Sequence, residues 1–143
     1  MSVTGTELVA AALERQGVNA FFFIMGAPMQ GVEKACLNSG MRGIDVRHEQ
    51  AAAMMAHAYS RVLNKPGVCM ACSGPGALNL GTGLANALVD CAPVVALGGS
   101  GHALMQLVAR SRGHASMALV FAHVDAHEVG HGVLHGHLHE LAT

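Results

Sequence analysis

The amino-acid sequence predicts an α/β fold in which a parallel sheet carries helices on both faces. Short apolar runs alternate along the chain with longer segments that repeat apolar residues at helical spacing. Glycine or proline marks most of the junctions between these segments. The apolar runs are continuous, as is typical of strands buried on both sides. Because each right-handed crossover lays a helix across one face, these observations together favour a parallel sheet.

The first half of the chain predicts two helices and two strands. Residues 4–16 have a threonine cap and apolar residues at helical spacing, and therefore predict an amphipathic helix. The apolar, aromatic run 20–25 predicts a strand. A second helix is expected over 29–38, where it ends shortly before a glycine, and a short second strand over 43–46.

The second half continues the same alternation. Residues 48–63, rich in alanine and methionine, predict a long helix that a Lys-Pro-Gly sequence ends. Residues 68–72 predict a third, buried strand, and 73–76 a tight loop. A further helix is expected over 77–90 and an apolar strand over 93–97.

The composition changes near residue 100. The last 43 residues hold eight of the ten histidines, and within them only 115–122 reads as a strand. We therefore divide the chain into a domain over 1–100 and a divergent, His-rich tail over 101–143.

Composition also limits the class of protein. The chain has 52% hydrophobic and 12% charged residues with a net charge of -1, so nucleic acid is not an expected partner. Its apolar runs fall short of the roughly 20 residues that span a bilayer, and no leader is evident, so we expect a cytoplasmic protein that does not enter membranes. Many apolar residues in one small domain favour a homodimer or larger oligomer. The four cysteines lack a disulfide pattern and are expected to be reduced and buried.

Three loops follow predicted strands and are candidates for function. They are Gly26-Ala27-Pro28, Arg47-His48-Glu49 and the segment 73–76. In parallel sheets, ligands bind outside the carboxyl ends of the strands. These loops therefore define the expected binding edge.

Four ordered motifs carry a resemblance to a known family. The sequences RHEQAAA, KPGVC, SGPGALN and LANA, which begin at residues 47, 65, 73 and 84, resemble acetolactate synthase and its thiamine diphosphate-dependent relatives. The resemblance covers roughly residues 3–100. It implies the N-terminal pyrimidine-binding domain of that family, with flavodoxin-like layering.

The resemblance gives Glu49 a specific role. It implies that this carboxyl group hydrogen-bonds a ring nitrogen of the aminopyrimidine, promoting the imino tautomer that removes the thiazolium proton of thiamine diphosphate. Glu49 is therefore the predicted catalytic residue. Without the neighbouring motifs, the residue would be interpreted as an ordinary first-turn helix carboxylate.

The other predicted cofactor-binding residues lie in the same loops. Glycine permits close approach and proline fixes a turn, so two short segments are expected to form backbone walls beside the cofactor. Asn79 matches the loop asparagine of the family, although a helix-start hydrogen bond would also explain it. The predicted cofactor-binding set is Gly26, Ala27, Pro28, Glu49, Gly74, Pro75, Gly76 and Asn79.

The resemblance also implies that the residues binding the diphosphate and Mg²⁺ belong to another domain. Complete enzymes of the family hold Mg²⁺ and the diphosphate with a Gly-Asp-Gly motif in a separate domain. The 143 residues of this sequence contain no such motif. A Phe-Gln-Glu stretch of the family is also absent from 101–117. We therefore expect a carboligase or decarboxylase of 2-oxo acids that is inactive as this chain alone and needs a chain supplying the diphosphate-binding domain. A noncatalytic dimerisation or regulatory domain is the alternative.

The tail offers a third reading. HEVGH at 127–131 matches the HExxH zinc motif, and His137 stands where a third ligand could lie, so His127, His131 and His137 are an alternative metal site. However, Leu134 replaces the glycine of the extended motif. The glycines of this segment also disfavour a helix. We interpret the tail as partly disordered, or as translated out of frame with the family.

Overall fold

Five parallel strands form a single sheet. The computed structural model describes residues 3–99 and 118–120, and the sheet order is β2-β1-β3-β4-β5. This is the strand order of flavodoxin-like folds, so the predicted α/β class is confirmed. The strands are β1 (Ala20–Phe23), β2 (Arg42–Asp45), β3 (Gly67–Ala71), β4 (Val94–Gly98) and β5 (Ala118–Val120).

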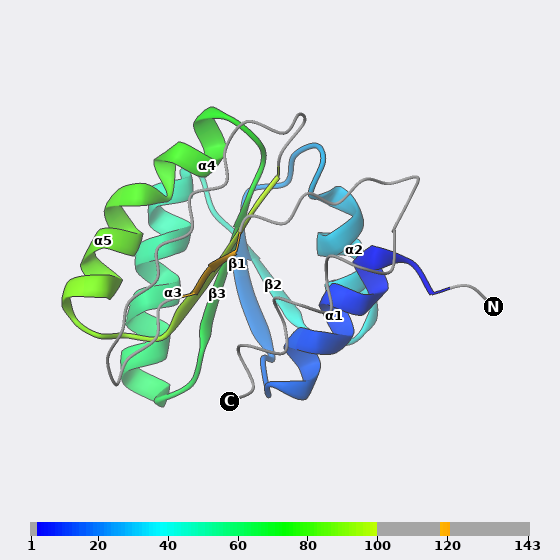
Figure 1. Ribbon diagram of the computed structural model, residues 1–143, viewed down its shortest axis with the longest axis horizontal. Helices are drawn as coiled ribbons and strands as arrows, with labels where there is room; N and C mark the ends of the chain where they lie inside the picture. Colours follow the sequence, from blue (N-terminus) through cyan, green and yellow to red (C-terminus); the bar gives the residue numbers. More distant parts are fainter. Residues whose placement is uncertain (1–2, 100–117, 121–143) are drawn as a thin grey trace.

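Helices cover both faces of the sheet, as predicted. Figure 1 shows α1 and α2 on one side of the strands and α3, α4 and α5 on the other. The helices are α1 (Gly5–Arg15), α2 (Gln30–Asn38), α3 (Glu49–Leu63), α4 (Pro75–Asn79) and α5 (Gly81–Val89). None of the helices in the described part of the chain is long and apolar enough to span a membrane.

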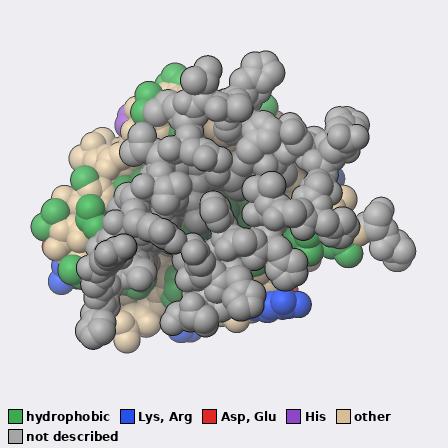
Figure 2. Space-filling view, viewed as in Figure 1, with side chains coloured by type: hydrophobic (Ala, Val, Ile, Leu, Met, Phe, Trp, Pro, Cys, Tyr) green, Lys and Arg blue, Asp and Glu red, His purple; other side chains and the backbone are tan. Residues whose placement is uncertain are grey.

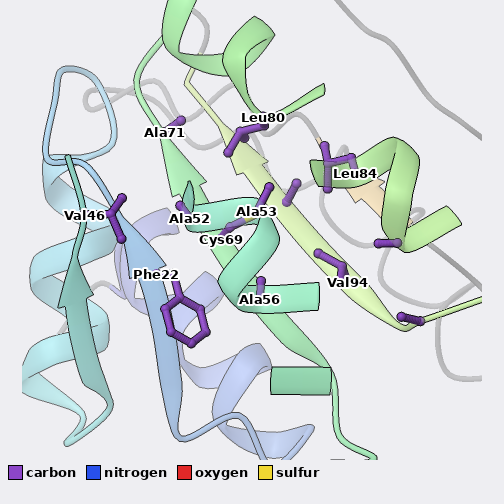
Figure 3. Packing of buried hydrophobic residues seen from close by; sticks show 13 residues of the cluster. Phe22, Val46, Ala52, Ala53, Ala56, Cys69, Ala71, Leu80, Leu84 and Val94 are labelled. Carbon is purple, nitrogen blue, oxygen red and sulfur yellow. The ribbon is translucent and has the colours of Figure 1, made fainter. Parts of the chain in front are cut away.

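Alternating strand residues build a separate core on each face. Phe21 and Phe23 of β1 pack toward α1 and α2, whereas Phe22 packs toward α3. Figure 3 shows Phe22 and Cys69 facing the alanines of α3. Since all of these strand residues are nearly inaccessible to solvent, both faces of β1 and β3 are buried, which explains why these two strands are continuously apolar.

Small residues let α3 lie close to its neighbours. A Cβ added at Gly67 of β3 would come within 2.0 Å of the Ala56 carbonyl oxygen, and one at Gly83 of α5 within 2.5 Å of Ala53 Cβ. Such contacts leave no space for a larger side chain. The position of α3, and therefore of Glu49 at its first turn, is fixed by close packing on two sides.

The structure corrects two of the predicted elements. The helix expected over 77–90 is two helices, α4 and α5, which meet at Leu80. The backbone of Leu80 stays helical (φ -66°, ψ -24°), and two glycines follow it at 81 and 83, where helix propensity is weak. The predicted loop over 73–76 is shorter, because Pro75 is accommodated at the first position of α4. The strand expected within 115–122 is β5, which pairs with β4.

Candidate functional site

The predicted loops meet at the carboxyl edge of the sheet. The turn after β1 touches the residue that follows β3, because a Cβ at Gly26 would lie 2.6 Å from Cys72 Cβ. The residue that follows the β2 turn, Glu49, is hydrogen-bonded to Asn79 at the end of α4. The parallel register brings these loops to the same edge, as the sequence predicts.

Glu49 is the first residue of α3 and is half-buried. His48 caps this helix from an extended conformation (φ -156°, ψ 137°), and its Nδ1 accepts a hydrogen bond of 3.1 Å from the Gln50 amide. The Asn79 side-chain amide donates to Glu49 Oε2 at 2.9 Å. No residue of 3–99 donates a hydrogen bond to Oε1. The carboxylate is therefore held through one oxygen, and the other is available.

Two predicted glycines are required by close contacts. Gly76 is buried in α4, and a Cβ there would lie 2.6 Å from Cys72 Sγ and 3.2 Å from Glu49 Oε1. Gly26 has the corresponding relation to Cys72 from the β1 side. Any larger residue would have to displace Cys72 or the carboxylate. Together, the two glycines and Cys72 form a narrow surface beside Glu49.

The remaining predicted residues flank this surface. The Ala27–Pro28 peptide is cis, and Pro28 Cδ lies 2.5 Å from the position of a Cβ at Gly99 after β4. Gly74 is exposed with φ +65°, and it directs the chain into Pro75 at the start of α4. None of these residues hydrogen-bonds Glu49. They shape the turns that carry Gly26 and Gly76.

Cys72 is the residue that the sequence interpretation missed. The pattern CxxC places it with Cys69, but Cys69 lies in the core, where burial raises the pKa of its thiol to about 12. Cys72 is half-buried at the carboxyl edge, between Gly26 and Gly76. Its position directly after a strand and before a Gly-Pro-Gly turn was the available signal. All four cysteines are free, and the prediction that all are buried is wrong for Cys72 and for the exposed Cys91.

The alternative metal site cannot be placed. His127, His131 and His137 lie outside the described residues. Within 3–99 and 118–120, no three His, Cys, Asp or Glu side chains are grouped to hold a metal ion.

Comparison with known proteins identifies the family. The family description "Thiamine pyrophosphate enzyme, N-terminal TPP binding domain" matches residues 3–143. The acetolactate synthase isozyme 2 large subunit of Escherichia coli (strain K12) is 48% identical over 97 residues, which are 68% of this chain and 18% of that protein. Acetolactate synthase of Bacillus subtilis (strain 168) is 49% identical over 96 residues, covering 67% and 17%. The chloroplastic enzyme of Arabidopsis thaliana is 44% identical over 96 residues, covering 66% and 14%.

The chain thus spans between 14% and 18% of the length of these curated relatives. The pairwise matches cover 96 or 97 residues, whereas the family match extends to Thr143, and the division at residue 100 stays a prediction. The motifs, the strand order and these matches agree. The chain belongs to the family of thiamine pyrophosphate enzymes and corresponds to their N-terminal domain, as found in acetolactate synthases.

Proposed function

We propose that this chain supplies the pyrimidine-binding half of a thiamine diphosphate site, with Glu49 as the catalytic carboxyl group. The observation that carries the proposal is the half-buried Glu49 carboxylate. Its Oε2 accepts a hydrogen bond from Asn79, and its Oε1 accepts none from residues 3–99. A catalytic acid or base must have an atom within reach of the group with which it exchanges a proton. Glu49 Oε1 meets that requirement.

The residues around Glu49 fit a flat aromatic ring. Gly26 and Gly76 let the two loops pack closely on Cys72, because any Cβ at either position would clash with that side chain, so only small groups lie beside Glu49. The turns at Ala27-Pro28 and Gly74-Pro75 hold these glycines in place. Thiamine diphosphate, when bound, supplies the carbon nucleophile for reactions of 2-oxo acids. The chain orients the ring, and Glu49 Oε1 holds or accepts the proton exchanged with it.

The diphosphate and Mg²⁺ require a second set of residues. We propose that a diphosphate-binding domain outside these 143 residues holds both, because the sequence has no Gly-Asp-Gly motif and spans a small part of its relatives. The substrate class that suits this site is a small 2-oxo acid, in a carboligation or decarboxylation. The chain alone is then expected to be inactive.

An assembly is also part of the proposal. Exposed apolar side chains lie on α3, α4 and α5, where Val62 is 80%, Leu78 62% and Val89 81% accessible. Figure 2 shows apolar side chains at the surface along the α5 side of the molecule. Such a surface suits a homodimer, a larger oligomer or the chain that supplies the diphosphate-binding domain. We place this assembly in the cytoplasm.

Calorimetry and proton exchange test the proposal. Thiamine diphosphate with Mg²⁺ should bind when a diphosphate-binding domain is present and not to the chain alone. In that assembly, Glu49→Gln should keep folding and cofactor binding but slow deuterium exchange at the reactive ring carbon of the cofactor by about a hundredfold or more. Binding that never appears with any such domain would instead favour a noncatalytic dimerisation or regulatory domain. An unchanged exchange rate in the variant would remove Glu49 from its catalytic role.

A further inference from the structure

We infer that Asn79 is a positioning residue that fixes the Glu49 carboxylate and determines which of its oxygens handles the proton. The inference rests on the function proposed for Glu49. It concerns a contact between two loops that lie 30 residues apart in the chain. Asn79 has no titratable group, so it does not itself exchange a proton, and its hydrogen bond to Glu49 is the route by which it acts on the proton transfer.

One face of α4 contacts both carboxylate oxygens. Gly76 and Asn79 are three residues apart and therefore lie on the same side of this short helix. Gly76, which has no Cβ, leaves room for Oε1. Asn79 donates to Oε2 at 2.9 Å. A single helical turn thus provides the space for one oxygen and the hydrogen bond for the other.

The backbone that carries Asn79 is held firmly although its side chain is exposed. Leu80, the next residue, is 1% accessible and packs in the core with α3 and α5. At the other end of the helix, Gly76 is in contact with Cys72. The hydrogen bond is exposed to water and contributes little to stability, but the fixed backbone keeps the donor in place. Orientation of the carboxylate, rather than stability, is the consequence.

The bond makes the two carboxylate oxygens unequal. Oε2 accepts from an amide that can only donate at that atom, so it is a poor position for a proton. Oε1 remains as the oxygen that holds or accepts the proton. Losing the Asn79 donor would allow the side chain to rotate and the two oxygens to exchange roles.

Nuclear magnetic resonance of the full chain tests the contact without cofactor. The side-chain amide pair of Asn79, assigned by its disappearance in Asn79→Asp, should shift clearly when Glu49→Ala removes the acceptor. The amide pair of Asn86 serves as the control, because Asn86 on α5 donates to Met54 Sδ and has no hydrogen bond with Glu49. Equal signals from Asn79 in the wild type and in Glu49→Ala would overturn the inference.

Cofactor assays in the complete assembly test the consequence. Asn79→Asp should slow deuterium exchange of the cofactor by roughly tenfold to a hundredfold, since misplacing a reacting group by about 1 Å has effects of this size. The dissociation constant for thiamine diphosphate should stay nearly unchanged, whereas Asn86→Asp should alter neither quantity. Equal losses of rate and binding would mean that Asn79 contacts the cofactor directly, and a wild-type rate would mean that it has no positioning role. Either result overturns the inference.

A double variant that exchanges the amide and the carboxyl group between positions 49 and 79 tests the contact separately from the proposed function of Glu49. Asn79→Asp places two carboxylates side by side, and their repulsion should lower the urea midpoint. In the double variant Asn79→Asp, Glu49→Gln, a Gln amide that donates to the new carboxylate replaces that repulsion, so the midpoint should return. The exchange rate should remain as low as in Glu49→Gln, because the carboxyl group is now at the wrong position. A midpoint that does not return counts against the inference. A wild-type rate in Glu49→Gln alone would refute the proposed function, while the amide shift would still test the contact.

Discussion

The buried carboxyl group of Glu33 predicts a measurable pH dependence of stability. Glu33 lies in the first turn of α2, has no exposed surface, and neither of its carboxylate oxygens has a hydrogen-bond partner among the described residues 3–99 and 118–120. Burial raises the pKa of this group from 4.5 to about 7. Burial first, and then the Glu33 charge, raise the pKa of Cys36, one turn further on, to about 11. The charged form of Glu33 is therefore unfavourable in the folded protein.

The sign and size of the effect follow from the two pKa values. At a pH below about 4.5 the group is protonated in both states, so it does not oppose folding. As the pH rises from about 4.5 to about 7, the unfolded chain ionises first and is stabilised, so the free energy of unfolding falls. Each pKa unit corresponds to about 1.4 kcal/mol, which gives a loss of at most about 3 kcal/mol by pH 8. Above that range the contribution is constant.

Glu33→Gln should remove this dependence. Urea unfolding of both proteins at about pH 5 and about pH 8 should show the variant close to the wild type at the lower pH and up to about 3 kcal/mol more stable at the higher pH. Glu14→Gln, which removes the same charge from an exposed position of α1, is the control and should not stabilise the protein at the higher pH. A variant whose advantage is equal at both values, or larger at about pH 5, would refute the reasoning.

Three further changes test the fold and the site by unfolding measurements. Thr4→Ala removes the capping box in which Thr4 and Glu7 bond one another's backbone amides, and should lower the free energy of unfolding by about 1 kcal/mol. Gly83→Ala forces a Cβ to within 2.5 Å of Ala53 Cβ and should cost about 1 to 3 kcal/mol, whereas Gly81→Ala, at an open position of the same helix, should not destabilise. Gly76→Ala should destabilise by a similar amount, and removing Cys72 Sγ with Cys72→Ala should recover part of that loss.

Local patterns were sufficient to predict most of the fold. Strands β1 and β3 are buried on both sides, and their short, continuous apolar runs with glycine or proline beside them are typical of such strands. The helix ends at Thr4 and Asn38 are set by caps and glycines that act over a few residues. The split between α4 and α5 was not predicted, because the weak helix propensity of the glycines at 81 and 83 does not by itself end a helix, and the burial of Leu80 at the junction depends on distant residues.

The contrast between local patterns and contacts of distant segments also explains how much of the site the sequence predicts. Glu49 and Gly76 are predicted by their motifs and Gly26 by its place directly after a strand, and each of these patterns is contained in one segment of the chain. The bond from Asn79 to Glu49 joins separate loops, so no local pattern can indicate it. The position of Cys72 after a strand indicates that it lies at the carboxyl edge, but not that it packs between Gly26 and Gly76. The sequence therefore predicts which residue carries the carboxyl group, and only the packing of α4 against α3 shows how that group is held. If the proposed mechanism is correct, a change at Asn79 that leaves every motif around Glu49 intact should alter the exchange rate.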